Sequence, residues 1–356
     1  MTDFIEIDFL GVETSKSGDA IAIRYCKDGV PTVHVVDGGY LETGDKLLNH
    51  IKTYYQTTRV DHVVLTHSDQ DHANGLRKIL EELDVGCLWM NRPWLYAAEL
   101  IGQFETYNSV QALERKLRAT YSALAVLEEI ALRRKIPIRE AFQGTSIGIF
   151  SVVAPSRSRY MDLVVSSEKT PQAVEPISMA TLSAAISKAF ATTTGWVRAL
   201  WGEEYFPPDG TSNENEMSIV QFANFKGKKY LLTGDAGREG LTEAADFMPV
   251  LGVTLPGIKI FQVPHHGGRH NVSTEVLDRW LGPKSPSQTD AYTWNAICSS
   301  ALADEHHPRK AVIRAMLHRG AHFASTEGKT VNFSDGISRE GWTAIAQAPY
   351  PEEQEQ

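Results

Sequence analysis

The chain has 356 residues, 42% of them hydrophobic and 22% charged, and its formal net charge at pH 7 is −9. It is long enough to bury a sizeable core, and its acidic balance argues against broad, non-specific binding to nucleic-acid backbones, which favour Lys and Arg. No long apolar run predicts a membrane span, and the acidic first residues do not match a secretory signal. The widely spaced Cys26, Cys87 and Cys298 form no CxxC pair, so we expect reduced thiols, a cytoplasmic location and no membrane partner.

The first part of the chain alternates strand and helix patterns. We expect strands at 19–25, 31–37, 61–67 and 86–93, and helices at 41–55 and 74–84. The strands are short and β-prone, whereas the helices show apolar residues at three- and four-residue spacing. This order predicts helices packed on a sheet.

Two insertions occupy the middle of the chain. Helical spacing covers about 94–145, a strand pattern follows at 146–155, and residues 156–211 are mixed in character. Within the second insertion, 178–201 has the pattern of a helix. We interpret it as part of a lid or packing hairpin rather than a membrane-surface helix, because its basic residues are few.

The remaining sequence returns to the strand-then-helix order. We expect strands within 217–235 and at 258–262, 292–300 and 329–334, helices at 236–248, 272–281 and 307–320, and a disordered tail at 351–356. The two similar halves predict one α/β domain over 1–350. Its fold would be a four-layer αββα sandwich, in which two sheets pack face to face between layers of helices.

The stretch "VVLTHSDQDHANGL" (63–76) places His67, Asp69, Asp71 and His72 close together, directly after a buried strand. Such groups, converging on one point, repel each other unless a cation lies between them. A helix cap is the alternative interpretation, but a cap needs one Asp rather than two Asp and two His. Imidazoles and carboxylates together indicate a divalent metal.

Further polar residues follow other expected strands, next to glycine or proline. They are Asp37 in "HVVDGG", Asp235 in "LLTGDAG", His265 and His266 in "QVPHHGG", and His307 in "DEHHP". One such residue is ordinary in a turn. Their repeated occurrence after strands predicts a common site for metal or proton chemistry.

Taken in order, these motifs resemble those of the metallo-β-lactamase superfamily, whose signature is HxHxDH. The sequence is closer to the branch found in the hydrolase domain of ComEC-type DNA-uptake proteins, where the motif is HxDxDH and here reads "HSDQDH" (67–72). Other stretches that resemble family motifs are "SGDAIAIRY" with "VHVVDGG", "NEMSIVQF", "LLTGD", "VPHHGG", and "HHP" followed by "STEGKTV". The resemblance covers most of the chain and implies the metallo-β-lactamase-like form of the sandwich, with helical insertions.

The resemblance also implies a set of metal ligands. His67 and Asp69 would bind one ion, and Asp71 and His72 would bind a second. Asp235 would bridge the two ions. One histidine of the pair after the strand at 258–262 would complete the second site, and of these we prefer His265 to His266.

Other residues would support the reaction. Asp37 would orient a ligand histidine, and His307 would contact substrate or donate a proton, so that Asp71 and His307 are the residues with implied catalytic roles. Two residues of the "NEMSIVQF" motif would shape the site, namely Asn215 and Ser218.

The sequence departs from the superfamily pattern at two positions. Many members have a further ligand histidine between the first motif and the bridging Asp, whereas the matching stretch "VVAPS" has Ala154, and no histidine occurs between His72 and His265. Gly268 stands where the branch commonly has Ser. We therefore expect one metal site to have fewer protein ligands than usual, and to hold its ion weakly or only with substrate.

The expected cofactors are two divalent ions, Zn²⁺ or Mn²⁺ with Mg²⁺ as a further candidate, which would activate a hydroxide and hold phosphoryl oxygens. Asp69 in place of a histidine favours the harder Mn²⁺ and Mg²⁺. We interpret the chain as a metal-dependent phosphodiesterase or nuclease with an anionic phosphodiester substrate, either nucleic acid or a small nucleotide. A lactone, lactam or thioester hydrolase and a non-catalytic metal-binding scaffold stay open, and the sequence does not indicate the oligomeric state.

Overall fold

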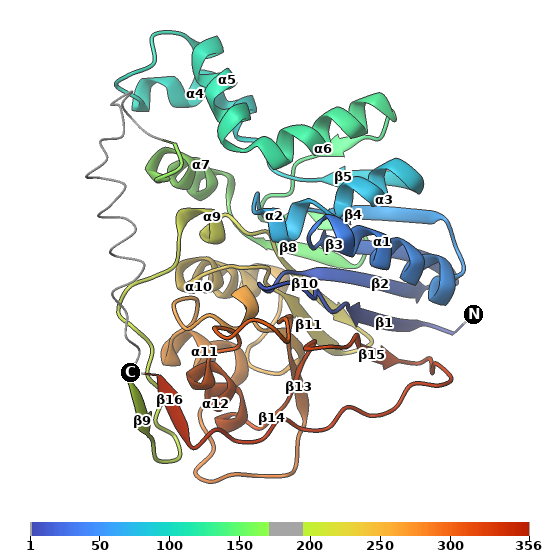
Figure 1. The fold of residues 1–356 in the computed structure, drawn as a ribbon, viewed down its shortest axis with the longest axis vertical. Helices are drawn as coiled ribbons and strands as arrows, with labels where there is room; N and C mark the ends of the chain where they lie inside the picture. The colour runs from blue at the N-terminus through green and yellow to red at the C-terminus, as the bar shows by residue number, and fades with distance from the viewer. Residues whose placement is uncertain (1, 171–194, 356) are drawn as a thin grey trace.

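A computed structural model describes residues 2–170 and 195–355, which form two seven-stranded sheets flanked by helices (Figure 1). The strands of the first sheet, in spatial order, are β15 (Val331–Asp335), β1 (Phe4–Phe9), β2 (Ala20–Lys27), β3 (Val30–Gly38), β4 (Arg59–Val64), β5 (Asp84–Trp89) and β6 (Ile138–Arg139). Those of the second are β14 (Ala321–Ser325), β13 (Trp294–Cys298), β12 (Ile258–Gln262), β11 (Lys228–Leu232), β10 (Val220–Phe225), β8 (Phe150–Ala154) and β7 (Ser146–Ile147).

The inner faces of the sheets pack against each other. In β2, Ile21 and Ile23 lie in a core that also contains Ile260 and Ile297 of the second sheet. The intervening Ala22 lies instead in the core on the outer face of the first sheet. Because successive side chains of a strand point to opposite faces, both faces of β2 are buried, as its nearly continuous apolar sequence requires.

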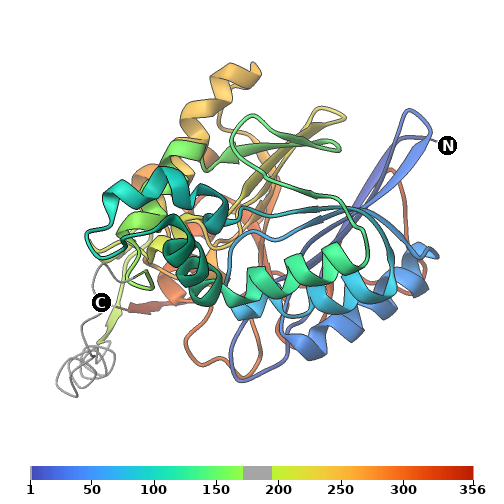
Figure 2. The ribbon, with the colours of Figure 1, turned by 90° about the horizontal axis from the view of Figure 1, so that it is seen from above.

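Helices cover both outer faces, as the views in Figures 1 and 2 show. The core of the first outer face includes residues of α1 (Leu41–His50), α3 (Leu76–Glu82), α5 (Val110–Thr120) and α6 (Ser122–Arg133). That of the second includes residues of α10 (Arg238–Phe247), α11 (Thr274–Leu281) and α12 (Lys310–His318). The predicted four-layer αββα arrangement is confirmed.

The insertions differ in how much of each the structure describes. The first contains α5 and α6, whose Leu117 and Leu127 are fully buried in the outer core of the first sheet. The second begins with α7 (Arg157–Ser166). Most of the helix expected at 178–201 lies outside the described residues, and at its described end Trp196–Arg198 form strand β9.

The C-terminal tail is a correction to the expected disorder at 351–356. Strand β16 (Glu353–Glu355) pairs antiparallel with β9. The carboxylate of Glu355 accepts hydrogen bonds from the backbone N–H groups of Lys310 and Ala311, at 3.0 and 3.1 Å. A carboxylate at a helix N-terminus satisfies donors that the helix itself leaves free, which explains why this acidic tail is held in place.

The direction of the parallel strands indicates which edge of the sheets holds the candidate site. β3, β4 and β5 run parallel in one sheet, and β11, β12, β13 and β14 run parallel in the other. Within each set, the loops after the strands emerge at one edge, where ligands bind in open α/β sheets. In the described part of the chain, no helix is both long enough and apolar enough to cross a membrane.

Candidate metal centre

The residues of the "HSDQDH" motif lie where β4 ends. His67 follows that strand, and Asp71 and His72 belong to α2 (Gln70–Ala73), a single helical turn. Asp69 occupies the N-cap position, yet its side chain makes no capping hydrogen bond. The helix-cap interpretation therefore does not account for Asp69, whose carboxylate faces other side chains instead.

Four donors from separate elements form one compact group. Asp19, His72, Asp235 and His266 are all buried and offer ligand atoms that lie within 4.8 Å of one another. Nε2 of His72 is 3.3 Å from Oδ2 of Asp235, and Nε2 of His266 is 3.9 Å from the same oxygen. Asp71 adjoins this group, because its Oδ2 is 3.4 Å from Nε2 of His266.

Several buried side-chain atoms of this group and of the neighbouring His67 have no hydrogen-bond partner among the described residues. They are Nε2 of His67, His72 and His266, and Oδ1 of Asp19 and Asp235. Buried polar atoms without partners are costly, and in native proteins they are normally satisfied. A divalent cation bound to imidazole nitrogens and carboxylates would satisfy them, so this donor set fits a metal ion.

Each histidine is held through its other ring nitrogen. Nδ1 of His72 lies 2.7 Å from Oδ2 of Asp37, and Nδ1 of His266 lies 2.9 Å from the carbonyl oxygen of Ser299. Nδ1 of His67 lies 3.3 Å from the hydroxyl of Ser218. With Nδ1 engaged in this way, Nε2 is left for a ligand, as is usual for metal-binding histidines. Asp37 and Ser218 therefore lie where the sequence predicted supporting residues.

The charges of the centre favour a cation. Burial alone would lower the pKa of His266, but the carboxylates of Asp235, Asp71 and Asp19 outweigh it and raise that pKa to about 9. Burial likewise opposes the charged form of Asp235, yet the surrounding histidines hold the pKa of its carboxyl well below the ordinary value. The carboxylates thus stabilise positive charge at His266, and a divalent ion at this position would supply that charge instead.

The expected first metal position is less compact. Nε2 of His67 is 3.9 Å from Oδ2 of Asp69 and 3.8 Å from Oδ2 of Asp235. The other oxygen of Asp69 contacts Nζ of Lys169 at 2.8 Å. Ala154, at the end of β8, is buried and offers no ligand atom.

The sequence preference for His265 over His266 is not reflected in the geometry. The compact group contains His266, which is buried, and not His265, whose side chain is 33% exposed. Nδ1 of His265 lies 2.9 Å from Oδ1 of Asn271, and its Nε2 remains 3.8 Å from Asp235. Asn215 lies beside it, with Nδ2 3.4 Å from Nδ1 of His265.

His307 lies beside the two histidines that follow β12. Its ring centroid is 5.6 Å from that of His265 and 6.2 Å from that of His266. Burial, followed by the charges of those two histidines, lowers the pKa of His307 to about 4, although Asp304 lies 3.2 Å from its Nδ1. His307 is therefore neutral near pH 7.

Two residues at this site were missed by reasoning from the sequence. Asp19 lies within the "SGDA" stretch that resembles a family motif, and its N–H donates to the carbonyl of Asp71, but no ligand role was assigned to it. Lys169 carries no sequence signal, because it stands in the mixed segment after α7 and meets Asp69 only in the folded chain.

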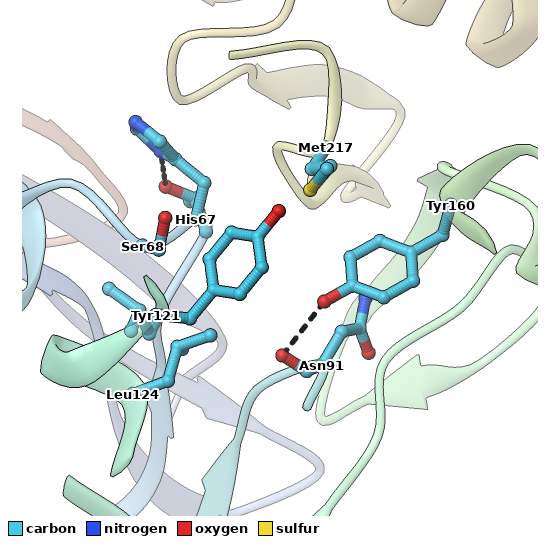
Figure 3. A pocket seen from close by; sticks show the side chains of 9 residues that line it. His67, Ser68, Asn91, Tyr121, Leu124, Tyr160 and Met217 are labelled. Carbon is cyan, nitrogen blue, oxygen red and sulfur yellow. Dashed lines mark hydrogen bonds between the residues drawn. The ribbon is translucent and has the colours of Figure 1, made fainter. Parts of the chain in front are cut away.

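Two hollows adjoin the centre. One is narrow and mainly apolar, and Figure 3 shows it beside His67, with Tyr121 and Tyr160 on its wall. The hydroxyl of Tyr160 donates to the carbonyl of Asn91 at 3.1 Å. The other hollow is polar and is lined by Ser68, Asp69, Gln70, Asp71, Thr120, Ser122, Ala123 and Lys169. The polar hollow places hydroxyls and an ammonium group beside the candidate ligands.

No family model matches the sequence, and no curated protein matches it. Among solved structures, the chain is similar to the hydrolase AbOPH of the β-lactamase superfamily, with 12% identity over 61% of this chain and 56% of that chain and a TM-score of 0.30. It is also similar to a diphosphatase from the PhnP family (12% identity, 93% and 98% covered, TM-score 0.36). A third similar structure is a mutant of the CmlA β-hydroxylase (12% identity, 94% and 54% covered, TM-score 0.41). The chain spans little more than half the length of the first and third of these proteins.

Proposed function

We propose that this chain is a metal-dependent hydrolase that acts on phosphodiester bonds. The observation that carries the proposal is a set of buried imidazole and carboxylate atoms that converge from both sheets and have no hydrogen-bond partner within 2–170 and 195–355. His72, His266 and Asp235, together with Asp71 or Asp19, would hold a divalent ion. Such an ion would activate a water molecule and polarise a phosphoryl oxygen.

The composition of the ligand set bears on which ion is bound. Half of the donors in the compact group are carboxylates, those of Asp19 and Asp235, and the carboxylate of Asp71 lies 3.4 Å from Nε2 of His266. Oxygen ligands suit harder ions. We therefore propose that Mn²⁺ or Mg²⁺ supports activity at least as well as Zn²⁺.

The surroundings of the centre bear on the substrate. The polar hollow offers the hydroxyls of Ser68, Thr120 and Ser122 and the ammonium of Lys169, which suit an anionic group. The net charge of −9 disfavours extended, non-specific contact with a nucleic-acid backbone. A small nucleotide or a short single strand is therefore the favoured class of substrate.

The proposal is tested with metal-stripped protein reloaded with Mn²⁺, Mg²⁺ or Zn²⁺. Turnover is measured on a chromogenic phosphodiester, single-stranded DNA and a cyclic dinucleotide, with a lactone for comparison. We expect metal-dependent phosphodiester cleavage that falls about 100-fold or more in Asp71→Ala, because that variant removes a carboxylate beside the ligands. Asp84→Ala, at the exposed start of β5, is the matched control.

The other outcomes separate the alternatives. Bound metal without turnover of any substrate would indicate a non-catalytic metal-binding scaffold. Turnover of the lactone alone would indicate a lactone hydrolase. Activity with Zn²⁺ but with neither Mn²⁺ nor Mg²⁺ would contradict the proposed metal preference.

A further inference from the structure

The two metal positions expected from the sequence are built differently. At the second, four buried donors lie within 4.8 Å of one another. At the first, Ala154 stands where a ligand histidine was expected, and the Asp69 carboxylate is engaged by Lys169 at 2.8 Å. A positive charge is therefore already present at the first position, and it is carried by the chain itself.

Lys169 is held in place by its neighbours. Its backbone N–H donates to the hydroxyl of Ser167 at 3.0 Å, and the N–H of Thr170 donates to the carbonyl of Ser167 at 3.0 Å. The Ser167 hydroxyl in turn donates to the carboxylate of Glu214. Ser167 and Thr170 are both buried. An exposed ion pair usually contributes little, but this lysine stands between buried, hydrogen-bonded residues that direct it toward Asp69.

The Lys169 ammonium competes with a metal ion for the same carboxylate. Like charges repel, so the ammonium on Oδ1 of Asp69, at 2.8 Å, disfavours a divalent ion between His67 and Oδ2 of the same carboxylate. Such an ion would also have fewer protein ligands than an ion at the compact group. The lysine side chain is still 47% exposed, so its free N–H groups can reach a bound anion from the polar hollow.

We propose that Lys169 takes the place of one of the two expected metal ions. The centre then binds a single divalent ion at the compact group, and the ammonium, held by Asp69, contacts an oxygen of the anionic substrate. The contact between Lys169 and substrate rests on the proposed function. The number of bound ions does not, because it is measured without turnover.

The first test counts bound metal. Chelator-treated protein is dialysed against increasing Mn²⁺, and metal per chain is determined by elemental analysis for wild type, Lys169→Met, Lys169→Arg and the control Lys46→Met on the exposed face of α1. We expect one ion per chain in wild type, Lys169→Arg and Lys46→Met. Lys169→Met should bind a second ion roughly tenfold or more tightly than wild type does.

A second variant introduces the ligand histidine that the superfamily pattern has at position 154. Ala154→His combined with Lys169→Met should bind two ions per chain. Ala154 is buried, so this double variant is used only if its circular dichroism matches that of wild type; the single Lys169→Met variant decides the question otherwise. Two ions of similar affinity in wild type, or unchanged binding in Lys169→Met, would overturn this inference alone. Absence of bound metal in every variant would overturn the proposed function itself.

The second test uses inorganic phosphate as the probe. With one equivalent of Mn²⁺ bound, phosphate binding is measured by calorimetry. Lys169→Met should bind phosphate at least tenfold more weakly than wild type, and Lys46→Met should bind it equally well. Equal affinity of wild type and Lys169→Met for phosphate would contradict the proposed contact between Lys169 and substrate.

Discussion

The imidazole of His72 and the carboxylate of Asp37 are joined by a 2.7 Å hydrogen bond between Nδ1 and Oδ2. The carboxylate is itself fixed, because it accepts the backbone N–H and the hydroxyl of Thr66 at 2.8 and 2.7 Å. The pair therefore holds the His72 ring so that Nε2 lies 3.3 Å from Asp235.

The Asp37–His72 contact predicts a defined loss when the charge of Asp37 is removed. Asp37→Asn should lower the affinity for Mn²⁺ about 10- to 100-fold with the fold retained, because a partner that orients a ligand histidine typically contributes that much. Calorimetric titration of the metal-free protein measures the change. Asp84→Asn, at the far end of the same sheet, should bind the ion as wild type does. An unchanged affinity in Asp37→Asn would show that the contact does not position a ligand.

The adjacent histidines predict unequal effects. His266→Ala should abolish tight metal binding and, with it, the rise in melting temperature that the ion produces, because His266 belongs to the compact group and His265 does not. His265→Ala should keep both, since its ring is one-third exposed and hydrogen-bonded toward Asn271. Melting curves with Mn²⁺ and with a chelator compare the two variants. The reverse order of effects would restore the sequence preference for His265.

The buried carboxyl of Asp8, which lies away from the metal centre, should make the stability of the fold depend on pH. Burial alone raises the pKa of its carboxyl, but hydrogen bonds from His50 and Arg339 outweigh burial and lower it from 3.8 to about 2. A lowered pKa in the folded state adds stability above the unfolded value, and this stability is lost as pH falls from about 4 through about 2. The shift corresponds to about 2 kcal/mol.

Asp8→Asn should therefore be less stable than wild type by about 2 kcal/mol at pH 7, and the gap should narrow toward pH 3. Urea unfolding at pH 7, 5, 4 and 3 measures it. Asp45→Asn, at an exposed position of α1, serves as the control. A gap that stays constant down to pH 3 would mean that the Asn variant acts through packing and not through charge.

The close packing of Gly75 against Gly38 should affect both stability and metal binding. A Cβ atom on Gly75 would lie 1.9 Å from the carbonyl oxygen of Gly38, the residue after Asp37. Its φ of −69° is ordinary, so space and not backbone conformation requires glycine. Gly75→Ala should cost about 1–3 kcal/mol of stability and weaken metal binding, because α2 must move away from β3. Gly102→Ala, where a Cβ meets no described residue within 4 Å, should be neutral in both unfolding and metal titration.

The sequence predicted several of the residues that lie together at the candidate site. The apolar run before "HSDQDH" predicts a buried strand, and β4 ends at Val64, three residues before His67. Asp37 was expected to orient a ligand histidine and lies against His72. These predictions depend on local patterns: an apolar strand delivers the residues that follow it to one edge of a sheet, whatever the rest of the chain does.

Other features could be decided only by the fold. His265 and His266 are neighbours of identical type, and the tight turn after β12, where both have positive φ, directs His266 into the compact group. Asp19 and Lys169 reach the centre from segments distant in sequence, the latter 100 residues from Asp69. The ordered tail depends on a helix N-terminus 44 residues away. Sequence by itself determined which residue types stand at strand ends. The packing of two sheets decided which of them meet, because contacts across layers depend on the whole chain and leave no periodic trace in it.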